Sequence, residues 1–377
     1  MKILREIFGR GMFRRGIFRR EVLTLGMVFV FLGSAFAFAE EGRTLLKMGM
    51  ILPQGTPAAN LILELKQEIL KKTQGKIKTE WYMGAVLGDE TDMRRKAILD
   101  QIQGGAWTVG GLSPIVSETQ LLEGPFFFNF TLSDYREVDC TLQKSYPIWQ
   151  KMFKEKGFVL VDWYQQGPIY FIHKSPANTM EDAEKFKAWS YPGYPMSEEI
   201  MKAWGVQNRI SLGLPEVLTG LQTGIIETAY ASPASLVGLQ WYTEVNYILG
   251  IPVTFSPVGV LVTQKAFDRL SPSDQKIFLE TFRSKTSQVT QSLREADRLA
   301  YKGLVEGEGA PLKVSGNPEI FAELKKRAGK VYENLTGKVW SQNFYQQIVS
   351  IRNQCRASLN EPLTLKPSPR SAGRGKG

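Results

Sequence analysis

Histidine and cysteine, which supply many catalytic and metal-binding groups, are scarce in this sequence. Its 377 residues include one histidine, His173, and two cysteines, Cys140 and Cys355. A Ser-His-Asp hydrolase or a histidine metal site would have to use His173 alone. His173 lies inside an apolar, strand-like segment, so we expect it to be structural. We predict no catalytic residue, no metal and no cofactor.

Motifs of the common enzyme classes are also missing. The sequence has no G-x-S-x-G, no P-loop and no G-x-G-x-x-G. Asp89, Glu90 and Asp92 fall where a helix is expected to begin, and carboxylates are favourable in a first helical turn. We interpret them as helix-start residues rather than a metal site. A periplasmic α/β enzyme that acts on a small molecule is the alternative function.

Side chains that could bind an uncharged molecule follow the segments that resemble strands. In an open α/β sheet, a ligand meets the carboxyl ends of the strands. The set at these ends is aromatic and amide-rich and has no charge, which suits an apolar or weakly polar ligand. The predicted ligand-binding residues are Gln54, Thr56, Gly111, Leu112, Gln165, Gln166, Trp189, Ser190, Tyr191, Tyr230, Ser232 and Trp241.

Some of these aromatic residues also have a structural interpretation. Trp189 and Tyr191 alternate along one strand, so one can face a ligand while the other faces the core. Trp241 could simply close a hydrophobic core, and residues 126–128, three phenylalanines, are typical of a buried core strand. Arg209 could reach the ligand, although a solvated position at the end of a strand is the simpler interpretation.

The elements that position these residues alternate between strand and helix. Residues 45–52, 76–83 and 106–109 are expected to be strands, and residues 58–72 and 90–103 helices, the second ending at Gly104-Gly105. This order predicts parallel pairing and an α/β sandwich. A helix over 134–156 and a strand over 158–164 follow, and residues 165–168 are expected to break that strand.

Residues 169–256 are rich in Tyr, Trp, Pro and Gly and form a distinct stretch. We predict strands over 169–173, 186–191 and 207–210, with helices near 196–204, 215–223 and 234–241. A strand over 258–263 returns to the first lobe, and helices over 271–303, 318–335 and 337–359 complete the chain. The predicted lobe I therefore comprises residues 40–165 and 257–360, and lobe II residues 166–256. Two crossings between lobes make a hinge with a cleft.

Both ends of the sequence are basic. Residues 1–39 combine a basic segment with an apolar run that ends in Ala37-Phe38-Ala39, which is typical of a cleaved secretory signal peptide. An uncleaved membrane anchor is the alternative, and Met12 could be the true start. Residues 361–377 are rich in Pro, Gly, Ser and Arg and are expected to be a disordered basic tail. We therefore predict an exported, periplasmic protein.

The net charge of +10 comes almost entirely from these ends, since residues 1–39 carry +5 and the tail +4. A nearly neutral body argues against nucleic acid as a partner, because binding phosphates requires clustered Lys and Arg on one face. A scaffold or adhesin that uses the basic tail is a third hypothesis. In an oxidising compartment Cys140 and Cys355 could pair, but two buried free thiols are an equal alternative.

One segment resembles a known family. Residues 218–227, L-T-G-L-Q-T-G-I-I-E, followed by Ser232-Pro233, are similar to the "Y-T-A-L-Q-T-G-V-V-D-G…N-P" segment of the solute-binding subunits of TRAP (tripartite ATP-independent periplasmic) transporters, dicarboxylate-binding type. Residues 84–90, 122–128 and 262–272 resemble other segments of that family in the same order. The resemblance implies a type II periplasmic binding protein fold: two α/β lobes joined by hinge strands, a long bracing helix and C-terminal helices.

The sequence departs from this family at one position. Family members carry "K-I-R-V-P" on the first strand of lobe II, and the resemblance implies that this Arg grips the substrate carboxylate in a bidentate fork. This chain has K-A-W-S-Y-P over residues 187–192, so Ser190 or Trp189 takes the place of the Arg. The chain resembles the branch that lacks the usual carboxylate-binding Arg and carries L-Q-W, here residues 239–241.

The resemblance implies a receptor rather than an enzyme. Such a receptor closes by hinge motion on its ligand and delivers it to the membrane permease subunits of a TRAP transporter. Without the Arg, we expect an apolar or weakly polar ligand, with an amphipathic carboxylate as the remaining possibility. For this branch, a helical-repeat periplasmic lipoprotein is a further partner that the resemblance implies.

Overall fold

The computed structural model describes residues 43–360. The predicted signal peptide (1–39) and basic tail (361–377) lie outside the described residues. Within residues 43–360, no helix combines the length and the apolar composition needed to cross a membrane.

The first half of the sheet has the predicted β-α-β-α-β order. Strand β1 pairs in parallel with both β2 and β3. Thr56 accepts a hydrogen bond from the amide of Ala59 and Asp89 from that of Asp92, so both connecting helices begin with a side-chain cap. The elements are β1 (Thr44–Met50), α1 (Pro57–Lys72), β2 (Ile77–Tyr82), α2 (Glu90–Ile98) and β3 (Gly104–Thr108).

Gly104 and Gly105 do not end helix α2, as the sequence predicted, but begin strand β3. A Cβ atom at Gly104 would lie 2.1 Å from the carbonyl oxygen of Leu261, and one at Gly105 would lie 2.5 Å from that of Gly49. The two glycines therefore let neighbouring strands approach closely, which is a typical use of glycine within a sheet.

Two long strands, β4 (Phe158–His173) and β9 (Thr254–Thr263), pair in antiparallel fashion and form the middle of the sheet. The predicted break at residues 165–168 is wrong, because β4 continues through it. The register shifts between Gln165 and Gly167, which is the signature of a β-bulge. Gly167 has φ of 115°, and a Cβ atom there would lie 2.0 Å from Oδ2 of Asp297, so this position requires glycine.

The second half of the sheet is built on the far end of β4. The strand order of the path is β2-β1-β3-β9-β4-β7-β5-β6, with β8 pairing both β4 and β10. Strands β7, β8 and β10, each three or four residues long, were not predicted. The elements are α5 (Met180–Glu184), β5 (Lys187–Ser190), α6 (Pro195–Ala203), β6 (Asn208–Ser211), α7 (Val217–Thr223), β7 (Thr228–Ala231), α8 (Pro233–Gly238), β8 (Tyr247–Leu249) and β10 (Lys313–Ser315).

Hydrophobic cores lie on both faces of this sheet. Along β4, Trp163 and Phe171 belong to one core, whereas Tyr164 and Ile172 belong to the cores of the opposite face. The first core includes residues of α4 (Arg136–Glu155), α6, α11 (Pro318–Leu335) and α12 (Gln342–Asn360). Helices α1, α7 and α8 contribute to the other two cores. The result is the layered α/β sandwich that the alternating pattern predicts.

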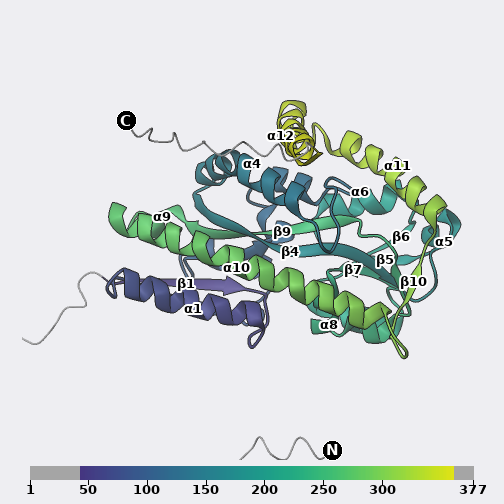
Figure 1. The fold of residues 1–377 in the computed structure, drawn as a ribbon, viewed down its shortest axis with the longest axis horizontal. Coiled ribbons are helices and arrows are strands. Elements are labelled where there is room, and N and C mark those ends of the chain that lie inside the picture. Colours follow the sequence, from purple (N-terminus) through teal and green to yellow (C-terminus); the bar gives the residue numbers. More distant parts are fainter. Residues whose placement is uncertain (1–42, 361–377) are drawn as a thin grey trace, which may run out of the picture. The chain divides into compact units, whose positions relative to one another are not determined.

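Helix α10 (Pro272–Val305) spans both halves of the sheet. It follows the short helix α9 (Gln264–Phe267), packs against α1 early in its course and against α8 later, and contacts β4 between them (Figure 1). This is the long helix of the predicted fold class. Helix α11 packs on α6, and β10 pairs with β8, so part of the segment assigned to lobe I contacts elements assigned to lobe II. The lobe boundaries themselves stay a prediction.

Short helical segments connect β3 to α4. They are α3 (Val109–Leu112) and the 3-10 helix η2 (Ser117–Glu123). Two further 3-10 helices, η3 (Leu214–Glu216) and η4 (Trp241–Glu244), lie in the second half. Phe127 and Phe128 are buried as predicted, but residues 126–128 form no strand. Phe126 has φ of 55°, a left-handed conformation that interrupts any extended chain there.

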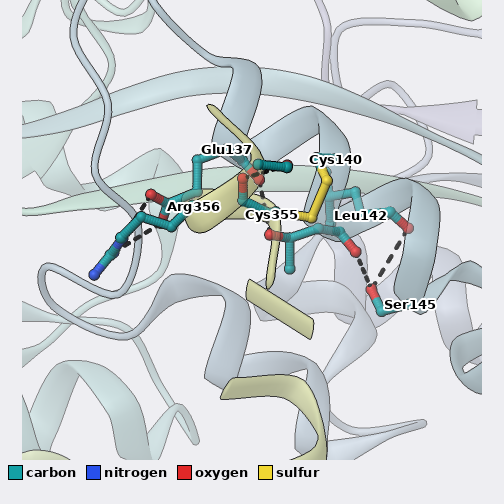
Figure 2. The surroundings of a disulfide bond; sticks show 8 residues. Glu137, Cys140, Leu142, Ser145, Cys355 and Arg356 are labelled. Carbon is teal, nitrogen blue, oxygen red and sulfur yellow. Dashed lines mark hydrogen bonds and ion pairs between the residues drawn. A yellow bond between two sulfur atoms is a disulfide. The ribbon is translucent and has the colours of Figure 1, made fainter. Parts of the chain in front are cut away.

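The two cysteines form a disulfide between α4 and α12 (Figure 2), which decides between the two alternatives that the sequence left open. The Cys140–Cys355 bond closes a chain separation of 215 residues. Beside it, both carboxylate oxygens of Glu137 lie 2.8 Å from guanidinium nitrogens of Arg356. Glu137 is buried, so this bidentate pair and the disulfide together fasten the last helix to α4.

Removing the disulfide should lower the free energy of unfolding. For a loop this long, the chain-entropy model gives about 5 kcal/mol. We expect the double variant C140A/C355A to unfold at lower denaturant concentration than the wild type and to be insensitive to dithiothreitol. Reduced wild type should match the double variant. Equal stability of oxidised and reduced wild type would show that the helix is held without the bond.

Candidate ligand-binding cleft

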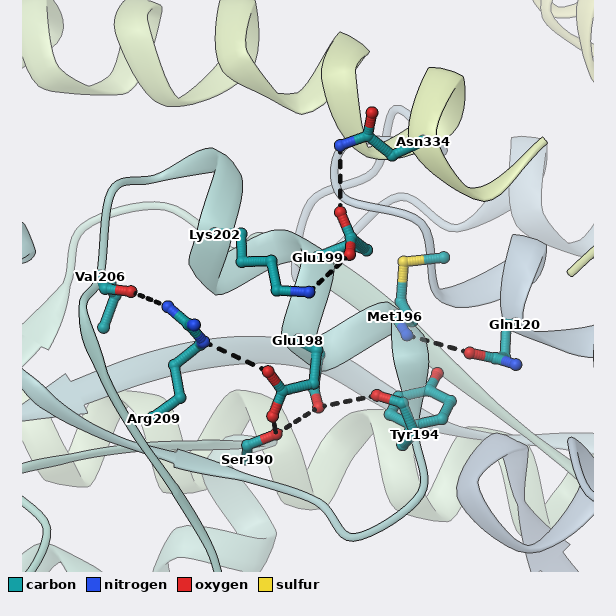
Figure 3. Close-up of polar contacts among 11 residues, drawn as sticks. Gln120, Ser190, Tyr194, Met196, Glu198, Glu199, Lys202, Val206, Arg209 and Asn334 are labelled. Atoms are coloured by element: carbon teal, nitrogen blue, oxygen red, sulfur yellow. Dashed lines mark hydrogen bonds and ion pairs between the residues drawn. The ribbon is translucent and has the colours of Figure 1, made fainter. Parts of the chain in front are cut away.

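The segment before α6, residues 191–196, contacts the short helices α3 and η2, which follow strand β3, at three places. The Tyr194 hydroxyl donates a hydrogen bond to the carboxyl of Glu123 on η2. The side-chain oxygen of Gln120 accepts a hydrogen bond of 3.0 Å from the amide of Met196 (Figure 3). A Cβ atom at Gly110 would lie 3.5 Å from the ring of Tyr191. These contacts join the two halves where the strand ends meet, which is where the sequence predicts the ligand.

Glu123 is the centre of this junction. One carboxyl oxygen accepts a hydrogen bond from Tyr194 and the other from the Ser256 hydroxyl on β9. The Thr254 hydroxyl donates a bond of 2.6 Å to the backbone oxygen of Glu123, which fixes the main chain. Burial raises the pKa of Glu123 to about 7, the two hydroxyls oppose that rise, and the nearby charge of Glu90 adds to it.

Glu90 is a second carboxyl in the same region. Asp89 caps α2 as predicted, but Glu90 turns inward and is buried. Its carboxylate accepts hydrogen bonds of 2.7 Å from the amide and 2.6 Å from the hydroxyl of Thr108. Burial raises the pKa of Glu90 to about 7. Its charge also helps to raise the pKa of Tyr191 well above the usual value, an effect that burial dominates.

Four of the predicted aromatic residues lie together and form what we call the aromatic cluster: Trp189, Tyr191, Tyr230 and Trp241. Trp189 is its centre, stacked on Tyr230 at 4.7 Å between ring centroids and edge-on to Trp241 at 5.4 Å. Tyr191 lies edge-on to Trp189 at 6.1 Å. The Trp189 indole donates a hydrogen bond of 2.9 Å to the Leu212 carbonyl. Trp189 and Trp241 are buried, while Tyr191 and Tyr230 are partly exposed.

Ser190 points to the opposite face of β5, toward α6. Its hydroxyl donates a hydrogen bond of 2.5 Å to Glu198 and lies 3.2 Å from the hydroxyl of Ser197. The other carboxylate oxygen of Glu198 accepts a bond of 3.2 Å from Arg209, whose guanidinium also donates to the Val206 carbonyl (Figure 3). Arg209 is therefore engaged by a protein carboxylate rather than presented to a ligand.

The remaining predicted ligand residues have other roles in this structure. Gln54 is exposed and Thr56 caps α1, while Gly111 and Leu112 are buried in α3. Ser232 caps α8.

The two glutamines of the β4 bulge face different helices. The side-chain oxygen of Gln165 accepts a hydrogen bond of 3.1 Å from Arg294 of α10, and its amide donates to Asp139 of α4. Gln166 donates a bond of 2.9 Å to the hydroxyl of Ser235 in α8. Both amides tie the middle of β4 to its surrounding helices.

Asp297 of α10 is buried at the same bulge. One carboxylate oxygen accepts a hydrogen bond of 2.9 Å from the amide of Ala234 at the start of α8, close to Ser232, and the other approaches Gly167. Burial raises the pKa of Asp297 to about 7. This carboxyl therefore links the long helix, the bulge and the second half of the sheet.

His173 is structural, as the sequence predicts. Its Nε2 lies 2.6 Å from the Ser315 hydroxyl, and its ring stacks on Phe186 with 5.2 Å between centroids. Burial lowers its pKa to about 3, so it stays neutral at physiological pH.

Four residues of the candidate site were not among the ligand-binding residues predicted from the sequence. They are Glu90, Glu123, Tyr194 and Ser256. One signal was available for Glu123, which is the only charged residue among the apolar residues 121–128. Such a lone acid is rarely buried without a specific reason. Tyr194 and Ser256 carried no comparable signal, because their role comes from a contact between segments distant in sequence.

Comparisons with known proteins agree with this fold. Residues 48–338 match the model of the family described as bacterial extracellular solute-binding protein, family 7. A solute-binding protein of Chromohalobacter salexigens is 23% identical over 231 residues, which cover 61% of this chain and 67% of that protein.

Two solved structures are similar. One is the sugar acid binding protein of Advenella mimigardefordensis in complex with galactonate, with a TM-score of 0.75, 15% identity and coverage of 83% of this chain and 99% of that chain. The other is a TRAP periplasmic solute binding protein of Desulfovibrio salexigens with bound orotic acid, also with a TM-score of 0.75, at 16% identity and coverage of 84% and 100%.

The chain therefore belongs to the bacterial extracellular solute-binding proteins of family 7. Its fold is the α/β type II periplasmic binding protein fold, with the long helix α10 and C-terminal helices. Its class is a binding protein and not an enzyme, as the sequence predicted.

The buried carboxyl of Asp297 generates a pH prediction. Its pKa in the folded protein lies above that of an unfolded Asp, so the stability that Asp297 contributes should increase as the pH falls from about 7 to about 4. The variant D297N keeps the acceptor for Ala234 and removes the charge. We expect its free energy of unfolding at pH 8 to exceed that of the wild type by about 2–4 kcal/mol, measured by denaturant titration.

The matched control is D100N. Ion pairing, first with Lys265, lowers the pKa of Asp100 to about 2, so its removal should destabilise the protein at pH 8. If D297N is destabilised at pH 8 as well, the Asp297 carboxylate is a net stabilising group and our interpretation is wrong.

Proposed function

We propose that this protein is the periplasmic receptor of a TRAP-type secondary transporter and that it closes by hinge motion on an apolar or weakly polar ligand. The observation that carries the proposal is the aromatic cluster beside Ser190. Partly exposed tyrosine rings occupy the strand ends of the second half, and the nearby guanidinium of Arg209 is held by Glu198. Ring faces and hydroxyls suit a ligand with a large apolar surface.

The hinge of this receptor would be the middle of β4 and β9. These strands run through both halves, and the bulge at Gln165–Gly167 interrupts their ladder at one point. Hinges commonly use a few residues of this kind to absorb changes in φ and ψ. Tyr194, Met196 and Tyr191 would separate from Glu123, Gln120 and Gly110 on opening. A ligand that contacts both halves would shift the population toward the closed form.

The related structures bind acids, galactonate in one case and orotic acid in the other. A carboxylate is gripped best by a bidentate guanidinium. The strand β5, Lys187–Ser190, contains no Arg, and Ser190 donates to a protein carboxylate instead. We therefore place this chain in the branch that lacks the carboxylate-binding Arg and propose that it does not recognise small carboxylates in that way.

The proposed partners follow from the same assignment. Residues 1–39 would direct export and be cleaved, and the mature receptor would deliver its ligand to the membrane permease subunits. A helical-repeat periplasmic lipoprotein is a further proposed partner. We propose no nucleic acid partner, because the body of the chain between its basic ends is nearly neutral.

Ligand-induced stabilisation tests this proposal. Apolar or amphipathic ligands should raise the melting temperature, because binding at ten times the dissociation constant adds about 1.4 kcal/mol, or a few degrees. Succinate at millimolar concentration should cause no shift. The variant Y191A removes a partly exposed ring and should reduce the shift, whereas Y242A, which alters a ring outside the aromatic cluster, should not. A clear shift with succinate would contradict the proposed ligand class.

A further inference from the structure

The carboxyl of Glu123 has capacity for hydrogen bonds that the protein leaves unused. A carboxylate can accept about four hydrogen bonds. Glu123 receives one from Tyr194 and one from Ser256 on its side chain. The residue as a whole keeps some exposed surface, although its carboxyl is largely desolvated, at the junction of η2 with the segment before α6. A ligand held between the two halves can therefore donate to it directly.

The charged group that acts on this carboxyl is another carboxyl, while the cation Arg94 acts on the neighbouring Tyr191. The groups that shift the pKa of Glu123 are its burial, two hydroxyls and the carboxyl of Glu90, and none of them is a cation among the described residues. The shift of Glu90 likewise comes from burial, from Thr108 and Gly111, and from Asp89. A second negative charge brought here by a ligand would be repelled, whereas a positive charge would be attracted.

Aromatic rings complete the surroundings. Tyr191 lies edge-on to Tyr194 at 6.4 Å, and the charge of Glu123 contributes to the raised pKa of Tyr230. The Tyr230 hydroxyl is buried and completes no hydrogen bond of standard geometry, although Ser197 lies close to it. Faces of Tyr and Trp rings attract organic cations, and one carboxylate beside such rings adds direct charge pairing.

We propose that Glu123 is the specificity-determining residue of the cleft and that it selects an amphipathic amine, with the ammonium group on Glu123 and the apolar body on the aromatic cluster. This inference rests on the proposed function, since it names the ligand class of that same site. The ammonium replaces the solvation that Glu123 loses on burial, and the tyrosine rings cover the carbon skeleton. Glu123 is ionised when the amine is bound, because a neighbouring cation favours the charged form.

Isothermal titration calorimetry at pH 7.5 with three probes tests this inference. Phenylethylamine, phenylethanol and phenylpropanoate share an apolar body and differ in the polar group. We expect the amine to bind the wild type at least tenfold more tightly than the alcohol, and the carboxylate to bind most weakly. The variant E123Q loses the charge and keeps one acceptor oxygen, so one of the two hydroxyls, that of Tyr194 or that of Ser256, has to accept a hydrogen bond from the new amide instead. It should bind the alcohol like the wild type and lose the tenfold preference for the amine.

The matched control is E198Q. Glu198 is also hydrogen-bonded by a hydroxyl, that of Ser190, but it faces α6 and Arg209. Its neutralisation should leave the preference for the amine intact. Equal binding of amine and alcohol by the wild type, or an equal loss of preference in E198Q, would overturn the role of Glu123 while leaving an apolar-ligand receptor in place. Preference for the carboxylate, or no binding of any probe, would overturn both proposals.

Discussion

The pairing of β4 with β9 is the constraint on which the rest of the structure depends. β9 pairs with β3 on one side and β4 pairs with β7 on the other, so the first-half strands β1–β3 and the second-half strands β5–β7 are built outward from this pair. Ser256 of β9 supplies one hydroxyl to Glu123, and the bulge of β4 contacts Asp297. The proposed hinge and one hydrogen-bond partner of Glu123 thus lie on the same strand pair.

Acidic groups are unusually buried around this pair. Glu90, Glu123 and Asp297 each have a pKa raised to about 7, chiefly because burial disfavours their charged forms. Asp297 accepts a hydrogen bond from the amide of Ala234 at the start of α8, and Glu90 accepts one from the amide of Thr108, just before α3. Both carboxyls therefore have structural roles. Glu123 differs, because the partners of its side chain are two hydroxyls, those of Tyr194 and Ser256. In our proposal, this difference separates Glu123, which meets the ligand, from Asp297 and Glu90, which stabilise the fold.

Much of the fold could be predicted from the sequence, because periodicity and capping residues act locally. The first β-α-β-α-β unit and the long helix α10 lie close to the predicted bounds. Two of the errors share one cause, which is long-range contact. Gly104 and Gly105 resemble a helix stop until Leu261 and Gly49 approach them, and the continuity of β4 through its bulge depends on β9. In the cleft, the aromatic residues could be named from strand ends, but Glu123 needed the fold, because Tyr194 and Ser256 are distant in sequence.

The most direct test of the account is the identity of the molecule that occupies the cleft. Native mass spectrometry of the protein purified from a periplasmic extract, followed by solvent extraction, would reveal it. The account predicts a molecule with an aromatic or aliphatic body and a basic nitrogen. A sugar acid or a dicarboxylate bound at one molecule per chain would contradict it.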